Sequence, residues 1–341
     1  AVMVAHVNAP DFQEHAENPA TLSKFWIQDI LKTKLGFEGV VITDAMRMGG
    51  IVKNYSDKYA LFETINAGSD IIIQNMDLKR SIDHIEKAVL SGIISEERIN
   101  TSALKVLKMK EKLGLHNNRM ISMKDTYTHV GRQKNFKLAA EIAQRSITLV
   151  VDKNNLLPLQ PEVDEALYLI DLYDGANNHT ESDLTKQLKR ADRKVKSFQI
   201  DKSDSLVVAD YILDQIPKDA LVLLNAFANP VEHKDDIFLP KVEAIFINKL
   251  INKTNRVIVT SFGSPYLIQD FKDAPVYICA YKGSTLLQKA VGNALIGNSN
   301  ISGILPVTIP GVAKVGEGIN VIGKKWPKRN SNWKPGKELK R

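Results

Sequence analysis

The sequence has little cysteine, few aromatic residues and no long apolar run. Its 341 residues contain one cysteine, Cys279, and 7% aromatic residues. One thiol excludes a disulfide framework and a metal site built from several cysteines. Apolar runs such as those within residues 39–42 and 71–73 are far shorter than the ~20 residues of a membrane-spanning helix. We therefore expect no disulfide and no membrane span, and no other residue spacing indicates a metal or cofactor site.

Positive charge exceeds negative charge only at the end of the chain. The formal net charge is +7, and residues 324–341 hold eight Lys or Arg against one Glu, which accounts for all of it. Residues 1–323 are therefore neutral. A basic tail on a neutral body predicts a solvated terminus and no nucleic-acid partner. Trp326 and Trp333 in this tail could instead cover an apolar patch or stack on a ligand.

The first 115 residues alternate between short apolar runs and longer helical patterns, which predicts βα units. The chain begins inside the first run, which indicates that sequence upstream is missing. Strands are expected at residues 1–5, 40–43 and 70–73, and helices at 21–35, 58–67, 78–90 and 95–113. Such strands, buried on both faces, are typical of a parallel sheet. Three units could end an open sheet or be the last three of an eight-stranded barrel.

Polar residues follow each predicted strand, at the edge where parallel α/β folds carry their sites. They are His6 and Asn8, then Thr43 and Asp44, then Gln74 and Asn75. Asp44 is the catalytic candidate of this set, and a turn or helix-capping role is the alternative. Met46 and Met48 are expected to line a pocket or pack in the core.

A second alternation follows a polar, aperiodic stretch at residues 116–135. Strands are expected at 146–151, 167–172, 195–200, 220–225, 256–261, 276–281 and 303–309, and helices at 136–145, 181–190, 206–216, 241–251 and 284–296. This pattern predicts a three-layer αβα sandwich. The predicted organisation is a barrel part at 1–118, a linker at 119–135, the sandwich at 136–323 and the basic tail at 324–341.

The segment Gly36 to Met48, which reads GFEGVVITDAMRM, resembles the nucleophile segment of glycoside hydrolase family 3. It is most similar to the β-N-acetylglucosaminidase branch, because Ala45 stands where the β-glucosidase branch usually has tryptophan. Further matches occur in order along the chain, at residues 3–7, 19–23, 67–70, 91–99, 143–149, 156–159, 261–266 and 302–307. The resemblance implies a barrel followed by an αβα sandwich, and favours a periplasmic or extracellular location.

The resemblance also implies roles for two residues. Asp44 would be the nucleophile of a retaining glycosidase, ionised and hydrogen-bonded, with Thr43 as one donor. His6 would hydrogen-bond the sugar or Asp44, with a structural histidine bonded to backbone as the alternative. The family's acid/base His–Asp pair belongs to a motif upstream of residue 1 and is absent from this chain. Glu232, with Asp235 and Asp236, is an alternative acid that no motif supports.

Two functions from different classes follow from these residues. The first is an exo-β-N-acetylglucosaminidase acting on peptidoglycan or chitin fragments, with β-glucosidase or β-xylosidase activity as a narrower variant. The second is a catalytically silent carbohydrate-binding or assembly module. Because three βα units cannot close an eight-stranded barrel, the partners expected are an N-acetylglucosamine oligosaccharide and a missing barrel half or partner chain.

Overall fold

The computed structural model describes residues 1–12, 18–74, 77–161, 165–173, 181–191, 194–228 and 239–326. The chain divides into two compact units, Ala1–Thr126 and Tyr127–Arg341. The predicted domain ranges remain predictions. Glu232, Asp235 and Asp236, and the tail from residue 327 onward with Trp333, lie outside the described residues.

Three parallel strands form the sheet of the first unit. They are β1 (Val2–Val4), β2 (Val41–Ala45) and β3 (Ile71–Ile73), in the order β1-β2-β3. The register aligns Met3 with Ile42 and Ile42 with Ile71. Each crossover between parallel strands passes through helical segments, as their geometry requires. The predicted α/β class is therefore confirmed.

Helices cover one face of this sheet. They are the 3₁₀ helix η2 (Ala20–Leu22), the π-helix η3 (Phe25–Lys34), α1 (Gly49–Val52), α2 (Asp57–Ala67), α3 (Leu78–Leu90) and α4 (Glu96–Lys112). Ser56, Asp77 and Ser95 begin α2, α3 and α4, and each side chain accepts a hydrogen bond from a backbone N–H of the first turn. Gly68, with a φ of 114°, ends α2 in the left-handed conformation that favours glycine.

The other face of the sheet is apolar and partly exposed. Met3 is 57% exposed, and Ile42 and Ile71 beside it are only half-buried. The expectation that these strands are buried on both faces is therefore wrong for the described residues. The reason is that the helices pack only against the side of the sheet that carries Val4, Val41 and Ile72.

The predicted helix at residues 21–35 is divided in two. Ser23 has extended backbone, with φ −106° and ψ 117°, and ends η2. In η3 the hydrogen bonds reach five residues back, as from the Leu35 N–H to the Ile30 carbonyl at 2.9 Å. The spacing of apolar residues in the sequence does not by itself distinguish this π-helix from an α-helix.

A six-stranded mixed sheet forms the centre of the second unit. Its strands are β4 (Thr148–Asp152), β5 (Ala166–Tyr173), β6 (Lys194–Asp201), β7 (Leu221–Phe227), β8 (Val257–Ser261) and β9 (Val276–Cys279). Their order is β4-β9-β8-β7-β5-β6, and the β4–β9 pair is antiparallel. The strand predicted at residues 303–309 is wrong, because only isolated bridges pair this region, and Pro306, which lacks an N–H, interrupts it.

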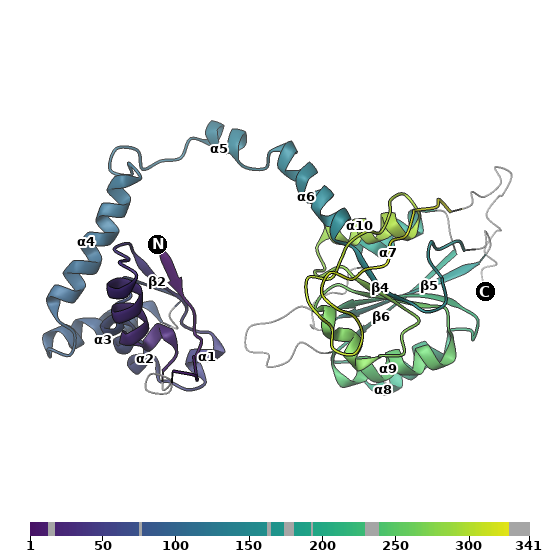
Figure 1. Cartoon of the computed structure of the whole chain (residues 1–341), viewed down its shortest axis with the longest axis horizontal. Helices are drawn as coiled ribbons and strands as arrows, with labels where there is room; N and C mark the ends of the chain where they lie inside the picture. The colour runs from purple at the N-terminus through teal and green to yellow at the C-terminus, as the bar shows by residue number, and fades with distance from the viewer. Residues whose placement is uncertain are drawn as a thin grey trace, which may run out of the picture. The chain divides into compact units, whose positions relative to one another are not determined.

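Helices pack on both faces of this sheet (Figure 1). One face carries α6 (Gln133–Ser146), α7 (Asp183–Arg190) and α10 (Thr285–Leu295), and the other carries α8 (Leu206–Asp214) and α9 (Lys241–Lys253). A short helix, α5 (Met123–His129), lies in the segment for which the sequence predicts no period. Among the described residues, no helix has the length and apolar character needed to cross a membrane.

Candidate active site

Asp44 is the fourth residue of β2, close to the carboxyl end of the strand. Along β2, Val41, Thr43 and Ala45 are buried, whereas Ile42 and Asp44 are partly exposed. The alternation therefore places Asp44 on the less covered face of the sheet. Its carboxylate Oδ1 accepts a hydrogen bond of 2.7 Å from the Ala45 N–H. A carboxylate in this position is fixed at one oxygen and remains accessible.

A bulge in β2 includes Asp44. Ile42 pairs with Ile71 and Ala45 pairs with Ile73, so three steps along β2 face two along β3. Bulges re-aim side chains and are frequent beside active sites. The Thr43 hydroxyl fills the irregularity by accepting from the Ile73 N–H at 3.1 Å. The hydrogen bond described at Asp44 thus comes from Ala45, where the sequence predicts Thr43 as a donor.

His6 lies just beyond β1, and protein groups contact both of its ring nitrogens. Nδ1 is 2.8 Å from the Thr21 hydroxyl, and Nε2 is 2.9 Å from the Ala45 carbonyl. This is the backbone-bonded arrangement that was the alternative for His6, and contact with a sugar stays a prediction. Thr21, fully buried, is a site residue that the analysis of strand exits missed. The sequence signal for Thr21 is the family resemblance at residues 19–23, which includes it.

Two further described residues, Met46 and Gln74, follow the carboxyl ends of β2 and β3. Met46 is 5% exposed and also lines a cavity of about 240 Å³ with Ile51, Tyr55 and Arg80 among others. It therefore fills both roles expected of it. Gln74, directly after β3, has a φ of 52°, which is uncommon for a residue with a Cβ and is concentrated at functional sites.

Comparison with known proteins identifies the first unit. Residues 1–109 match the model of the glycosyl hydrolase family 3 N-terminal domain. This part of the chain belongs to glycosyl hydrolase family 3. A β-N-acetylglucosaminidase/β-glucosidase from Cellulomonas fimi is 25% identical over 52% of the chain and 33% of that relative. A lysosomal β-glucosidase from Dictyostelium discoideum is 24% identical over 86% of the chain and 40% of that relative.

Solved structures resemble both units of the fold. A β-glucoside phosphorylase is matched with a TM-score of 0.74 at 23% identity, over 90% of this chain and 57% of that one. A family 3 β-N-acetylglucosaminidase from a Paenibacillus species is matched with a TM-score of 0.69 at 22% identity, over 88% of this chain and 56% of that one. The chain thus spans between a third and three fifths of the length of these proteins.

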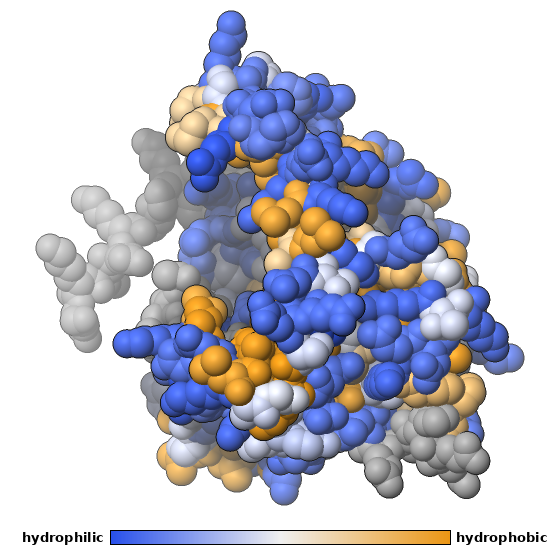
Figure 2. Space-filling model, turned by 90° about the vertical axis from the view of Figure 1, so that its left-hand side faces the viewer, coloured by the Kyte–Doolittle hydropathy of each residue, from blue (hydrophilic) through white to orange (hydrophobic). Residues whose placement is uncertain are grey.

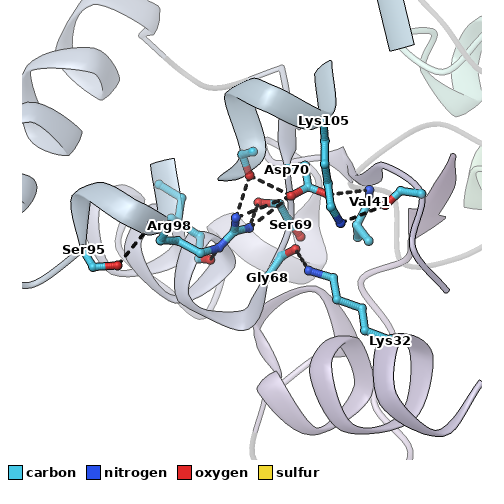
Figure 3. A network of polar contacts seen from close by, with 11 residues as sticks. Lys32, Val41, Gly68, Ser69, Asp70, Ser95, Arg98 and Lys105 are labelled. Atoms are coloured by element: carbon cyan, nitrogen blue, oxygen red, sulfur yellow. Dashed lines mark hydrogen bonds and ion pairs between the residues drawn. The ribbon is translucent and has the colours of Figure 1, made fainter. Parts of the chain in front are cut away.

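A buried charged network lies at the opposite edge of the family 3 sheet (Figure 3). The fully buried Asp70 side chain accepts from the Val41 N–H at 3.0 Å and from the Ser102 hydroxyl at 2.7 Å. Arg98 and Lys105 of α4 lie 3.5 and 3.6 Å from its oxygens. Burial raises the pKa of a carboxyl, but these bonds and nearby lysines outweigh it and lower the pKa of Asp70. The network joins α4 to the amino ends of β2 and β3.

The second unit contains a buried carboxyl that the sequence analysis missed. Asp171 of β5 is 2% exposed and accepts from the Asn225 amide of β7 at 2.8 Å. Burial raises the pKa of Asp171, although this bond and those from Ser182 and Thr185 act in the opposite direction. Its strand neighbour Tyr173 belongs to an aromatic stack with Phe227. Asp171 lies outside residues 1–109, which the family 3 N-terminal domain model matches.

Proposed function

We propose that Asp44 is the nucleophile of a retaining β-glycosidase that removes terminal N-acetylglucosamine from peptidoglycan or chitin fragments. The observation that carries the proposal is the placement of Asp44 in a bulge at the carboxyl edge of β2, with one oxygen bonded to the Ala45 N–H. The family 3 match over residues 1–109 supports the reaction class. The names of the relatives support β-N-acetylglucosaminides, β-glucosides and β-xylosides alike.

The proposed reaction has two steps. The Asp44 carboxylate attacks the anomeric carbon, the bond to the leaving oxygen breaks, and a covalent glycosyl ester forms on Asp44. Water then attacks the same carbon and gives its proton to a general base, the sugar is released with retained configuration, and the carboxylate is restored. The Ala45 N–H donates to one carboxylate oxygen at 2.7 Å, which holds the carboxylate in one orientation for this attack.

Proton transfer to the leaving oxygen requires a second group. We assign it to a His–Asp pair outside this chain, as the resemblance to the family's β-N-acetylglucosaminidase branch implies. The same missing part would cover the apolar face on which Met3 is 57% exposed. Five further βα units, in the same protein or in a partner chain, would close the barrel and complete the sugar site.

The test is covalent labelling of the full chain. A fluorinated N-acetylglucosaminyl glycoside with a dinitrophenolate leaving group needs little acid assistance, so Asp44 can be tested without the missing acid. We expect peptide mapping to find the sugar on Asp44, and Asp44→Ala to abolish it. Glu38→Gln is the matched control, because Glu38 is an exposed carboxylate at the other end of the strand and its loss should leave labelling unchanged.

Other outcomes decide between the remaining hypotheses. A label on any other side chain contradicts the assignment of Asp44. Sugar binding by calorimetry with no covalent label supports the silent binding module instead. Turnover of dinitrophenyl β-glucoside or β-xyloside in preference to the β-N-acetylglucosaminide overturns the substrate assignment, and dependence of turnover on phosphate shows phosphorolysis in place of hydrolysis.

A further inference from the structure

A continuous row of hydrogen bonds runs from the end of β1 to the residue after Asp44. The Thr21 hydroxyl lies 3.0 Å from the Ala5 carbonyl and 2.8 Å from His6 Nδ1. His6 Nε2 lies 2.9 Å from the Ala45 carbonyl. On its amide side, Ala45 donates to the Asp44 carboxylate at 2.7 Å. The row therefore connects η2 to the candidate nucleophile through His6 and Ala45.

The chemistry of these groups fixes the proton on one nitrogen of His6. A carbonyl oxygen only accepts, so Nε2 carries a hydrogen and donates to Ala45. In a neutral ring Nδ1 is then an acceptor and takes the hydrogen of the Thr21 hydroxyl. In a charged ring Nδ1 donates to Thr21, and that hydroxyl turns its hydrogen to the Ala5 carbonyl. The contact with Ala45 is kept in both states.

The surroundings hold the ring in this orientation. Thr21 is fully buried and Ala45 is 6% exposed, so both partners of the ring are enclosed by protein. Gly50 packs against His6, because a Cβ added at Gly50 would lie 3.1 Å from the His6 Cβ and 3.3 Å from its carbonyl oxygen. The Met48 N–H also donates to the Ala45 carbonyl at 3.0 Å. Ala45 is thus fixed by two donors on its carbonyl side.

We propose that His6 is a positioning residue for Asp44, acting through the backbone of Ala45 and itself oriented by Thr21. This inference rests on the proposed role of Asp44 as the nucleophile. His6 fixes the carbonyl side of Ala45, so the N–H of Ala45 stays aligned with Asp44 Oδ1. The Asp44 carboxylate is then held in one orientation. This orientation matters because displacing a reacting group by 1 Å can lower the reaction rate about 10²-fold.

Two amide variants separate the two contacts of the ring. Glutamine places its amide nitrogen near the position of Nε2, and asparagine places its polar atoms near that of Nδ1. His6→Gln therefore keeps a donor for Ala45, whereas His6→Asn loses it. The full chain is labelled with the dinitrophenyl fluorosugar, and the rate of label formation on Asp44 is measured against reagent concentration.

We expect the maximal labelling rate to fall about tenfold in His6→Asn, the size of one lost hydrogen bond, and less than about twofold in His6→Gln. The reagent concentration at half-maximal rate should stay constant, since a residue that positions Asp44 changes the reaction step and not the binding of the sugar. Thr21→Val should fall between the two variants. Equal rates in His6→Asn and the unmodified chain overturn the inference, and so does a change confined to the half-maximal concentration.

A measurement independent of activity separates this inference from the proposed function. Ring nitrogen NMR shifts of His6 in the unmodified chain should show a hydrogen on Nε2 at neutral pH, and Thr21→Val should change the Nδ1 shift. A neutral ring with its hydrogen on Nδ1 overturns the inference, even where Asp44 is labelled. Absence of label on Asp44 in the unmodified chain overturns the proposed function, while the nitrogen shifts still decide the contact between His6 and Ala45.

Discussion

Asp70 holds a buried negative charge that α4 neutralises. Removing one partner of such a buried pair leaves the other charge without compensation, which costs about 3–5 kcal/mol. We therefore expect Asp70→Asn to lower the free energy of unfolding of the first unit by about 3 kcal/mol at pH 7. Urea unfolding followed by hydrogen exchange of peptides from β3 and α4 measures this. Asp29→Asn, on an exposed part of η3, should change stability by less than about 0.5 kcal/mol.

The effect of Asp70 depends on pH in a defined direction. The pKa of Asp70 is lowered on folding from its ordinary value of 3.8. Its contribution to stability is therefore complete above pH 3.8 and is lost as pH falls through the lowered value. The difference between the original chain and Asp70→Asn should shrink in this acid range. A difference that stays constant down to pH 2 would contradict the ion-pair explanation.

The sequence locates Asp44 better than it locates its partners. Position at a strand exit follows from the alternation of apolar and polar residues, so Asp44 at the carboxyl edge was predictable. The partners of His6 were not, because they depend on how η2, some fifteen residues onward, folds back on the end of β1. Thr43 was predicted to donate to Asp44, because the local pattern does not reveal the bulge. The bulge directs the Thr43 hydroxyl to β3 instead.

Close approach between two loops of the second unit requires glycine at position 263. A Cβ there would lie 1.8 Å from the Ala228 carbonyl oxygen, and backbone cannot rotate away as a side chain can. We expect Gly263→Ala to destabilise the second unit by about 3 kcal/mol, the upper end for overpacking. Thermal unfolding monitored by circular dichroism measures the shift.

Gly311 is the matched control for this substitution. Its φ is 71°, and an added Cβ would meet nothing within 4 Å. Gly311→Ala should therefore lower the free energy of unfolding only because alanine must adopt the left-handed conformation, by about 1–2 kcal/mol. Gly263 has no positive φ, so equal destabilisation by the two substitutions would contradict the steric explanation of glycine at 263.

Secondary structure was predictable where capping and periodicity agree. The helix at residues 78–90 has the predicted bounds, and α4 differs by one residue at each end from the predicted 95–113. Errors occur where local pattern does not decide. Residues 303–309 have strand composition but no ladder partner, and the short α5 lies in a stretch without apolar period. Whether a segment pairs as a strand depends on residues far away in the sequence, so its own composition does not predict the pairing.

The two units bury apolar side chains to different extents. In the second unit two large clusters enclose the sheet from both faces. In the first unit three small clusters lie on one face only, while Leu104 and Leu107 of α4 are more than half exposed and line a surface cavity of about 770 Å³. Apolar side chains also form patches among polar ones on the face that Figure 2 presents.

These separate cores predict two unfolding transitions in the intact chain. Stability follows the apolar area removed from water, so the first unit should unfold at a lower urea concentration than the second. Asp70→Asn should move only the first transition, and Gly263→Ala only the second, because Asp70 belongs to the first unit and Gly263 to the second. Urea unfolding followed by hydrogen exchange of peptides from α4 and from β7 reports each unit separately. One transition, shifted equally by both substitutions, would show that the units fold as a single cooperative body, and the uncovered face of the first sheet would then have no independent consequence for stability.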